Sequence, residues 1–229
     1  MSKLQRNKSI SGNNFILRED IKEELKLFSS TAYSQCRLCP RNCGVNRLEG
    51  QKGYCGETAI CRVSYIGPHY GEEPSISGTQ GSGTVFFSGC STRCFFCQNY
   101  QISLDGEGRE ITLSQLTTEV LSVAAKGVHN INLVTPDHFW PHIVKLAENI
   151  RKRGIHIPFV FNSSGYEKPS MVAEYAEVCE IFMPDFKYAD PSLAQICMGD
   201  SNYPGIAMDA IREMVRLRGF LSPWDPSGH

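Results

Sequence analysis

Eight of the ten cysteines in this 229-residue chain fall between Cys36 and Cys97, in two groups. The chain starts with MSKLQRNKSISGNN, which lacks the apolar core of a signal peptide. No apolar stretch approaches the roughly 20 residues that span a bilayer. We therefore expect a cytoplasmic protein without a membrane segment. Because clustered cysteines in a reducing compartment more often bind metal than form disulfides, the two groups predict metal centres.

Composition limits the classes of partner. The chain carries 23 Lys and Arg against 24 Asp and Glu, without a long basic block, and 41% of its residues are hydrophobic. Such a chain can bury a core, and its charge gives no reason to expect nucleic acid or a membrane surface as a partner. Cys179 and Cys197 stand alone among apolar neighbours, and we expect both to be small core residues.

Local composition divides the chain into four parts. Residues 1–33 are polar, and only IKEELKLF has an apolar stripe, so we expect an arm. Residues 34–83 are dense in Cys, Gly and Pro, which predicts a loop region organised by metal. Residues 84–219 alternate regularly, and 220–229 form a tail.

The alternating part predicts an α/β fold. Apolar, β-branched runs indicate strands at 84–88, 131–135, 157–161 and 181–187. Between them, helical spacing follows Thr112, which can form a capping box with Gln115, and returns at 141–153, 169–178 and 207–217. Alternating strands and helices imply right-handed crossovers and a parallel sheet, in which ligands bind at the carboxyl ends of the strands. The informative loops should start at Gly89, Thr135, Asn162 and Asp185.

The first of these loops carries Cys90, Cys94 and Cys97 in the pattern C-x3-C-x2-C. A structural zinc or an electron-transfer [4Fe-4S] cluster normally takes four protein ligands, whereas three thiolates leave one iron open. The alternatives are a zinc site that takes its fourth ligand from elsewhere, such as His138, and a chance group of unligated thiols.

This loop, with aromatic Phe96 just before the last cysteine, resembles the signature of the radical S-adenosylmethionine superfamily. The stretches GEEPSISGTQGSGTVFFSGC, CQNYQIS, HNINLVTP, FNSSGY and PDFKY resemble a subgroup close to the pyruvate formate-lyase activating enzymes. The resemblance implies a [4Fe-4S] cluster on the three cysteines and S-adenosylmethionine on its open iron, with Phe96 against the adenine. Reductive cleavage of that cofactor would give a 5′-deoxyadenosyl radical that abstracts hydrogen from a substrate.

The same resemblance implies a partial (β/α) TIM-like barrel with parallel strands, preceded by the Cys-rich region. Superfamily barrels usually have six strand and helix units. Because the chain offers four strands and then SPWDPSGH, we expect a barrel that is shortened at its carboxyl end.

The remaining loops supply expected cofactor contacts. Thr135 and Pro136 stand where many family members carry Gly-Gly-Glu, and their carbonyl groups can accept from the cofactor's ammonium group. Asp137 and His138 either contact cofactor or substrate, or merely begin the next helix. The resemblance places Asn162 near the ribose or the methionine carboxylate, although Asn-Ser-Ser-Gly is also ordinary turn sequence.

Asp185 and Lys187 occupy alternate positions of the last expected strand, so their side chains should point the same way and pair. The activating enzymes carry a similar Asp-x-Lys that is linked to the cofactor. Burying both charges would cost several kcal/mol unless they are paired or ligated. A cofactor role and a purely structural ion pair are the two interpretations.

The amino-terminal group contains Cys36, Cys39, Cys43 and Cys55, followed closely by Cys61. Four thiolates suffice for zinc or for a complete iron-sulfur cluster, and the spacing does not decide between these metals. Arg41 and Arg47 lie among these cysteines, where they either stabilise thiolate charge or face solvent.

The resemblance also implies partners. A radical enzyme of this type takes electrons from a donor such as flavodoxin or ferredoxin, and an activating enzyme acts on a glycine of a glycyl radical enzyme. The alternatives are the same chemistry on an unknown small molecule or peptide, and a non-catalytic iron-sulfur or zinc protein for electron transfer. The three-cysteine loop argues against the last, because a plain carrier needs a fourth ligand.

Overall fold

A single mixed sheet forms the centre of the protein. The computed structural model describes residues 18–29 and 31–220. Within them the strands lie in the order β3-β1-β2-β4-β5-β6, and β2, β4, β5 and β6 run parallel. The strands are β1 Arg62–His69, β2 Ser82–Phe87, β3 Arg109–Glu110, β4 Ile131–Val134, β5 Phe159–Ser163 and β6 Ile181–Pro184.

The four parallel strands confirm the α/β alternation expected between residues 84 and 187. Several boundaries differ from the prediction: β2 begins two residues earlier, β5 begins and ends two residues later, and β6 ends at Pro184 rather than at residue 187. Proline lacks the N–H that the next step of a ladder would need, which explains the early end of β6. Asp185 and Lys187 therefore lie in the loop after the strand.

The strand β1 was not predicted. It runs antiparallel to β2 and pairs at its start with β3, so the Cys-rich region contributes to the sheet itself. Gly67 and Pro68 concealed it, because proline within a run argues against a strand. Beyond Val63, β1 pairs on one side only, and a proline is tolerated on such an edge.

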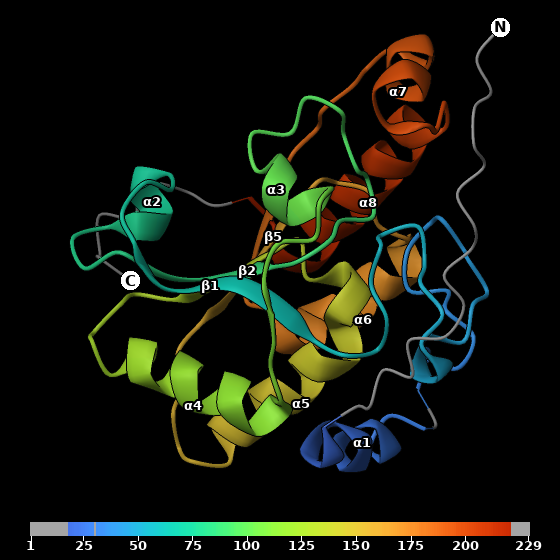
Figure 1. Cartoon of the computed structure of the whole chain (residues 1–229). Helices are drawn as coiled ribbons and strands as arrows, with labels where there is room; N and C mark the ends of the chain where they lie inside the picture. Colours follow the sequence, from blue (N-terminus) through green and yellow to red (C-terminus); the bar gives the residue numbers. More distant parts are fainter. Residues whose placement is uncertain (1–17, 30, 221–229) are drawn as a thin grey trace, which may run out of the picture.

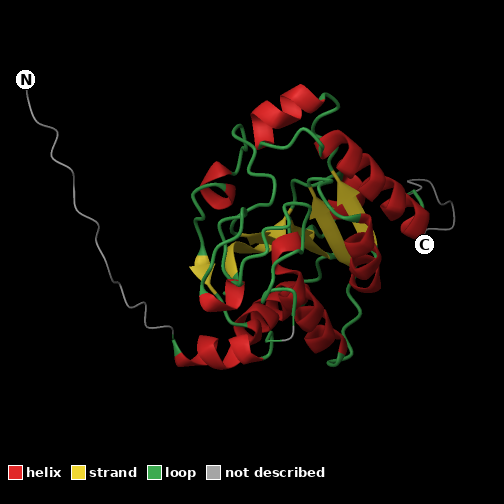
Figure 2. Cartoon of the chain, turned by 90° about the vertical axis from the view of Figure 1, so that its right-hand side faces the viewer, coloured by secondary structure: helices red, strands yellow, loops and turns green. Residues whose placement is uncertain are grey.

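Helices cover the sheet. In Figure 1, α4, α5 and α6 lie below the strands, whereas α3 and α7 stand above their carboxyl ends. Figure 2 shows the same helices around the sheet from the side. The helical elements are α1 Glu19–Lys26, η1 Arg47–Glu49, α2 Pro74–Ser77, α3 Tyr100–Ser103, α4 Leu113–Ala124, η2 Asp137–Phe139, α5 Trp140–Arg151, α6 Pro169–Val178, α7 Pro191–Met198 and α8 Tyr203–Arg218. Of these helical elements, none in the described part of the chain is long and apolar enough to cross a membrane.

Local sequence accounts for several helix ends. Thr112 and Gln115 form the expected capping box at the start of α4. Asp190 caps α7, a helix that the sequence pattern did not predict, by accepting from the N–H groups of Ser192 and Leu193. The signal was present in the Asp-Pro-Ser sequence before a short apolar run.

The main core lies between the sheet and α4, α5 and α6. It includes Phe28 and Tyr33, so the described end of the expected arm packs into the body of the protein. Cys179 is fully buried there, as predicted, while Cys197 on α7 is only half-buried beside a second, smaller core. Residues 1–17 of the arm and 221–229 of the tail lie outside the described residues.

Candidate functional site

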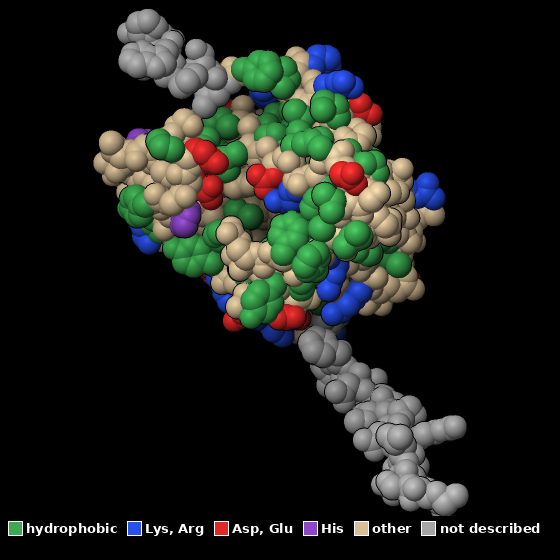
Figure 3. All heavy atoms as spheres, turned by 90° about the horizontal axis from the view of Figure 1, so that it is seen from above, with side chains coloured by type: hydrophobic (Ala, Val, Ile, Leu, Met, Phe, Trp, Pro, Cys, Tyr) green, Lys and Arg blue, Asp and Glu red, His purple; other side chains and the backbone are tan. Residues whose placement is uncertain are grey.

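The carboxyl ends of the parallel strands surround a cavity of about 700 Å³, here called the mouth cavity. One residue from each strand lies in register across its floor: Phe86, Val134, Asn162 and Met183. Figure 3, which looks down on this face, shows hydrophobic side chains around a hollow with charged groups at its margin. A volume of this size is typical of a site for a small molecule or cofactor.

The cysteine loop forms one wall of the mouth cavity. Cys90, Cys94 and Cys97 all line it; the first two are buried and the third is half-buried. The hydroxyl of Thr92 lies 3.0 Å from the Cys90 sulfur. Burial raises the pKa of the Cys90 thiol, so a metal that binds there must displace its proton.

This donor set fits an iron-sulfur cluster. All three thiols face one cavity, and no disulfide consumes any of the ten cysteines. Among the described residues, no three Cys, His, Asp or Glu side chains lie close enough to share a single metal ion. Thiolates around a cluster bind different iron atoms, so a cluster does not require them to meet at one point.

Most of the expected cofactor residues also lie at the mouth cavity. Phe96, Thr135, Asn162, Asp185 and Lys187 line it. Thr135 adopts a positive φ of 46°, an uncommon conformation for a non-glycine residue, directly after β4. Pro136 does not line the cavity.

Asp185 and Lys187 form the ion pair that alternate positions predicted. The expectation that both charges are buried was wrong, since the Asp185 side chain is 64% exposed and that of Lys187 29%. Both residues follow β6 at the open margin of the cavity, where water screens the pair. Exposed ion pairs contribute little to stability. The cost of burying charge therefore gives no reason to assign a structural role to this pair.

Asp137 and His138 are buried beneath the cysteine loop and do not line the mouth cavity. The His138 Nε2 atom lies 2.7 Å from the Ser88 carbonyl oxygen, just before that loop. This contact favours a structural role over contact with the cofactor. It also counts against His138 as a fourth zinc ligand, because the ring nitrogen that faces the loop is already paired with a main-chain carbonyl.

Several lining residues were not predicted. They are polar or titratable side chains from the end of β1, the turn after it, the segment after Cys97, and the end of β5 with the residue that follows: His69, Glu72, Glu73, Gln98, Asn99, Ser163 and Ser164. Without β1, nothing in the sequence placed His69 or Glu72 beside the parallel strands. Partial burial raises the pKa of the Glu72 carboxyl.

Comparison with protein families identifies the superfamily of the chain. The sequence pattern of the Radical SAM superfamily, where SAM is S-adenosylmethionine, matches residues 84–219. The chain belongs to this superfamily. Membership implies a [4Fe-4S] cluster and SAM as cofactors, and radical chemistry in general. It does not identify a subgroup or a substrate.

A relative extends the match into the Cys-rich region. The chain is 27% identical over 191 residues to the uncharacterized protein MJ0674 of Methanocaldococcus jannaschii. The match covers 80% of this chain and 54% of the relative, so the chain spans about half the length of the protein it matches.

Three of the amino-terminal cysteines lie beside Gly53 or Arg47: Cys43 and Cys55 beside the first, and Cys36 beside the second. A Cβ atom on Gly53 would lie 3.5 Å from the Cys43 sulfur and 3.6 Å from that of Cys55. Cys36, Cys39 and Cys55 are buried, and Cys43 is half-buried. Burial raises the pKa of the Cys55 thiol to about 11, opposed by Arg47, and also raises that of Cys39.

The two arginines of this region do not simply face solvent. Arg47 is 1% exposed and stacks on Tyr33, while its Nη1 atom lies 4.0 Å from the Cys36 sulfur. Arg41 instead donates to carbonyl oxygens of the cysteine loop and of the end of α7. Arg47 therefore fits the expected role beside thiolate charge, and Arg41 ties segments together.

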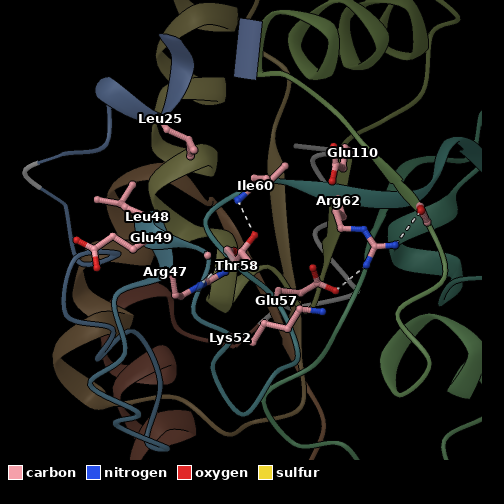
Figure 4. A pocket seen from close by; sticks show the side chains of 12 residues that line it. Leu25, Arg47, Leu48, Glu49, Lys52, Glu57, Thr58, Ile60, Arg62 and Glu110 are labelled. Atoms are coloured by element: carbon pink, nitrogen blue, oxygen red, sulfur yellow. Dashed lines mark hydrogen bonds and ion pairs between the residues drawn. The ribbon is translucent and has the colours of Figure 1, made fainter. Parts of the chain in front are cut away.

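A second cavity, of about 850 Å³, opens on the side of the Cys-rich region. Figure 4 shows Arg47, Lys52, Glu57 and Arg62 around it, with Glu57 and Arg62 joined as an ion pair. Its charges are mixed and none of its lining residues is a cysteine. The three cysteines of the loop line the mouth cavity instead.

Proposed function

We propose that this chain binds SAM in the mouth cavity and cleaves it reductively. When bound, the [4Fe-4S] cluster and SAM would supply a 5′-deoxyadenosyl radical that abstracts hydrogen from a substrate. The observation that carries the proposal is that Cys90, Cys94, Cys97 and Phe96 face Asn162, Asp185 and Lys187 across one cavity.

The residues of this chain would divide the work as follows. The three thiolates hold three irons, and the Phe96 ring provides an apolar face for the adenine. Asn162 offers an amide to the ribose or the methionine carboxylate, while the carbonyl group at Thr135 accepts from the ammonium; Pro136, expected beside it, lies outside the cavity. Lys187, held by Asp185, presents a positive charge at the margin of the cavity.

The substrate we favour is a glycine of a partner glycyl radical enzyme, in keeping with the resemblance to activating enzymes. The open margin of the mouth cavity would admit a polypeptide loop. Flavodoxin or ferredoxin would supply the electron. Because the chain spans about half of the relative it matches, the substrate and partners of the whole protein are part of this proposal.

Two alternatives remain for the experiment to separate. The same radical chemistry can act on a small molecule or peptide, and the polar residues His69 and Glu72 at the cavity would then recognise it. A non-catalytic iron-sulfur or zinc protein would bind metal without cleaving SAM.

We also propose a second metal centre on Cys36, Cys39, Cys43 and Cys55. Four free thiols, three of them buried, support it. Buried thiols with raised pKa values are protonated without metal, so metal binding would replace those protons.

The test is anaerobic reconstitution with iron and sulfide, followed by dithionite and SAM. We expect 5′-deoxyadenosine and methionine to form, and SAM to change the paramagnetic spectrum of the reduced cluster. The control variant Cys94→Ala should lose both. Absence of 5′-deoxyadenosine from protein with a complete cluster would reject the enzymatic proposal and leave the non-catalytic one.

A further inference from the structure

The amino-terminal cysteines lie directly behind the loop that holds the catalytic cluster. The N–H of Cys90 points at the carbonyl oxygen of Cys55, 3.4 Å away. Gly89 packs against the same oxygen, because a Cβ atom on this glycine would lie 2.6 Å from it. One main-chain contact thus connects Cys55 of the amino-terminal group with Cys90 of the cysteine loop.

A buried positive charge marks the amino-terminal group as a site for an anion. Arg47 forms no ion pair with a carboxylate among the described residues, and it donates to the Thr58 carbonyl oxygen at 2.6 Å and to that of His138. Its Nη1 atom lies 4.0 Å from the Cys36 sulfur. Because an unpaired buried charge is costly, a metal centre bound by four thiolates, which carries net negative charge, would supply the missing partner.

The thiols also have neighbours suited to a cluster. The Tyr54 N–H donates to the Cys43 sulfur at 3.2 Å, and N–H groups that face cysteine sulfur are among the features that set cluster potentials. In the described part of the chain, neither cysteine group brings three thiols within reach of one ion.

We infer that Cys36, Cys39, Cys43 and Cys55 hold a second iron-sulfur cluster that passes electrons to the catalytic one. This inference rests on the proposed function. An electron would leave a reduced one-electron donor of the flavodoxin or ferredoxin class, reside on the second cluster, and pass to the first; no bond forms or breaks in these steps. Arg47 and Lys52, which belong to the same segment as these cysteines, line the second cavity. The donor could therefore approach this segment from a side that is separate from the mouth cavity.

The first test counts metal after anaerobic reconstitution. We expect about eight iron and eight sulfide per chain, about four of each from each cluster. Cys39→Ala and the less buried Cys43→Ala should each remove about half, whereas Cys61→Ala, a buried cysteine just outside the group, should remove none. A wild-type content of about four iron with one zinc would overturn the inference.

The second test follows reduction of the catalytic cluster by its paramagnetic signal, assigned as the signal that Cys94→Ala lacks. With reduced flavodoxin as donor, that signal should appear at least tenfold more slowly in Cys43→Ala than in the wild type. With dithionite, a small diffusible reductant, the two rates should agree within threefold. Equal rates with flavodoxin would refute the relay. Because this readout precedes SAM cleavage, it remains decisive even if no 5′-deoxyadenosine forms and the proposed function fails.

Discussion

A Cβ atom on Gly89 would lie 2.6 Å from Cγ of Glu57, so the residue that opens the cysteine loop has no room for a side chain. Gly89 also adopts a φ of +77°, which disfavours other residues. Gly89→Ala should therefore lower the free energy of unfolding by about 2 to 4 kcal/mol and reduce iron at the loop. Urea unfolding and iron analysis measure both effects.

Gly127 provides the control for this substitution. It adopts a similar φ of +83°, but a Cβ atom there meets nothing within 4 Å. Gly127→Ala should therefore cost only the backbone strain, about 1 kcal/mol, with iron content unchanged. Equal losses in the two variants would show that the close contacts at Gly89, with Glu57 and with the Cys55 carbonyl oxygen, have no effect.

The neighbouring aromatic residues Phe95 and Phe96 allow a matched test of cofactor binding. Both are exposed and meet edge to face at 5.3 Å between centroids, but only Phe96 lines the mouth cavity. Stacking of an aromatic ring on a base is worth about 1 to 3 kcal/mol. Phe96→Ala should thus raise the Kd for SAM about tenfold in cluster-loaded protein, measured by anaerobic calorimetry. Phe95→Ala should change it less than twofold; a comparable loss there would contradict the assignment.

Sequence periodicity predicted the parallel half of the fold because buried strands and capped helices leave strong local patterns. The Thr112 capping box and the loops at Gly89, Thr135 and Asp185 were found in this way, whereas Asn162 proved to lie within β5. β1 was missed because its pairing with β2 is a long-range property and Pro68 contradicts the local pattern. His69 and Glu72 reach the mouth cavity through β1, so they were missed with it. The burial of Arg47 likewise depends on its fit against Tyr33, which no local pattern encodes.

Arg41 connects three segments around the cysteine loop. Its guanidinium donates to the carbonyl oxygens of Ser91 at 3.0 Å and Met198 at 2.6 Å, and it lies 3.8 Å from the centre of the Tyr54 ring. Lysine lacks the planar fork that serves several acceptors at once. Arg41→Lys should therefore lower the free energy of unfolding by about 1 to 3 kcal/mol in urea titrations.

The control for Arg41 is Arg37→Lys, because Arg37 is exposed and lies in the same segment. This change should stay within about 0.5 kcal/mol of the wild type. If Arg41→Lys is as mild, the contacts with the cysteine loop do not stabilise the fold.

Glu167 makes stability depend on pH. It is 2% exposed, its Oε2 atom has no hydrogen-bond partner among the described residues, and burial raises its pKa well above the usual 4.5, with Asp137 adding to the effect. The folded protein therefore keeps this proton where the unfolded chain has lost it, so stability falls as pH rises from about 4.5 toward the folded pKa. Glutamine cannot ionise, so Glu167→Gln should remove the loss of stability that this carboxyl causes as pH rises. The variant should gain about 1 to 3 kcal/mol in the free energy of unfolding over the wild type at pH 8 and much less at pH 5.

Urea unfolding across that pH range measures the difference, with the exposed Glu174→Gln as the control. Parallel curves for wild type and Glu167→Gln would mean that the carboxyl titrates alike in both states.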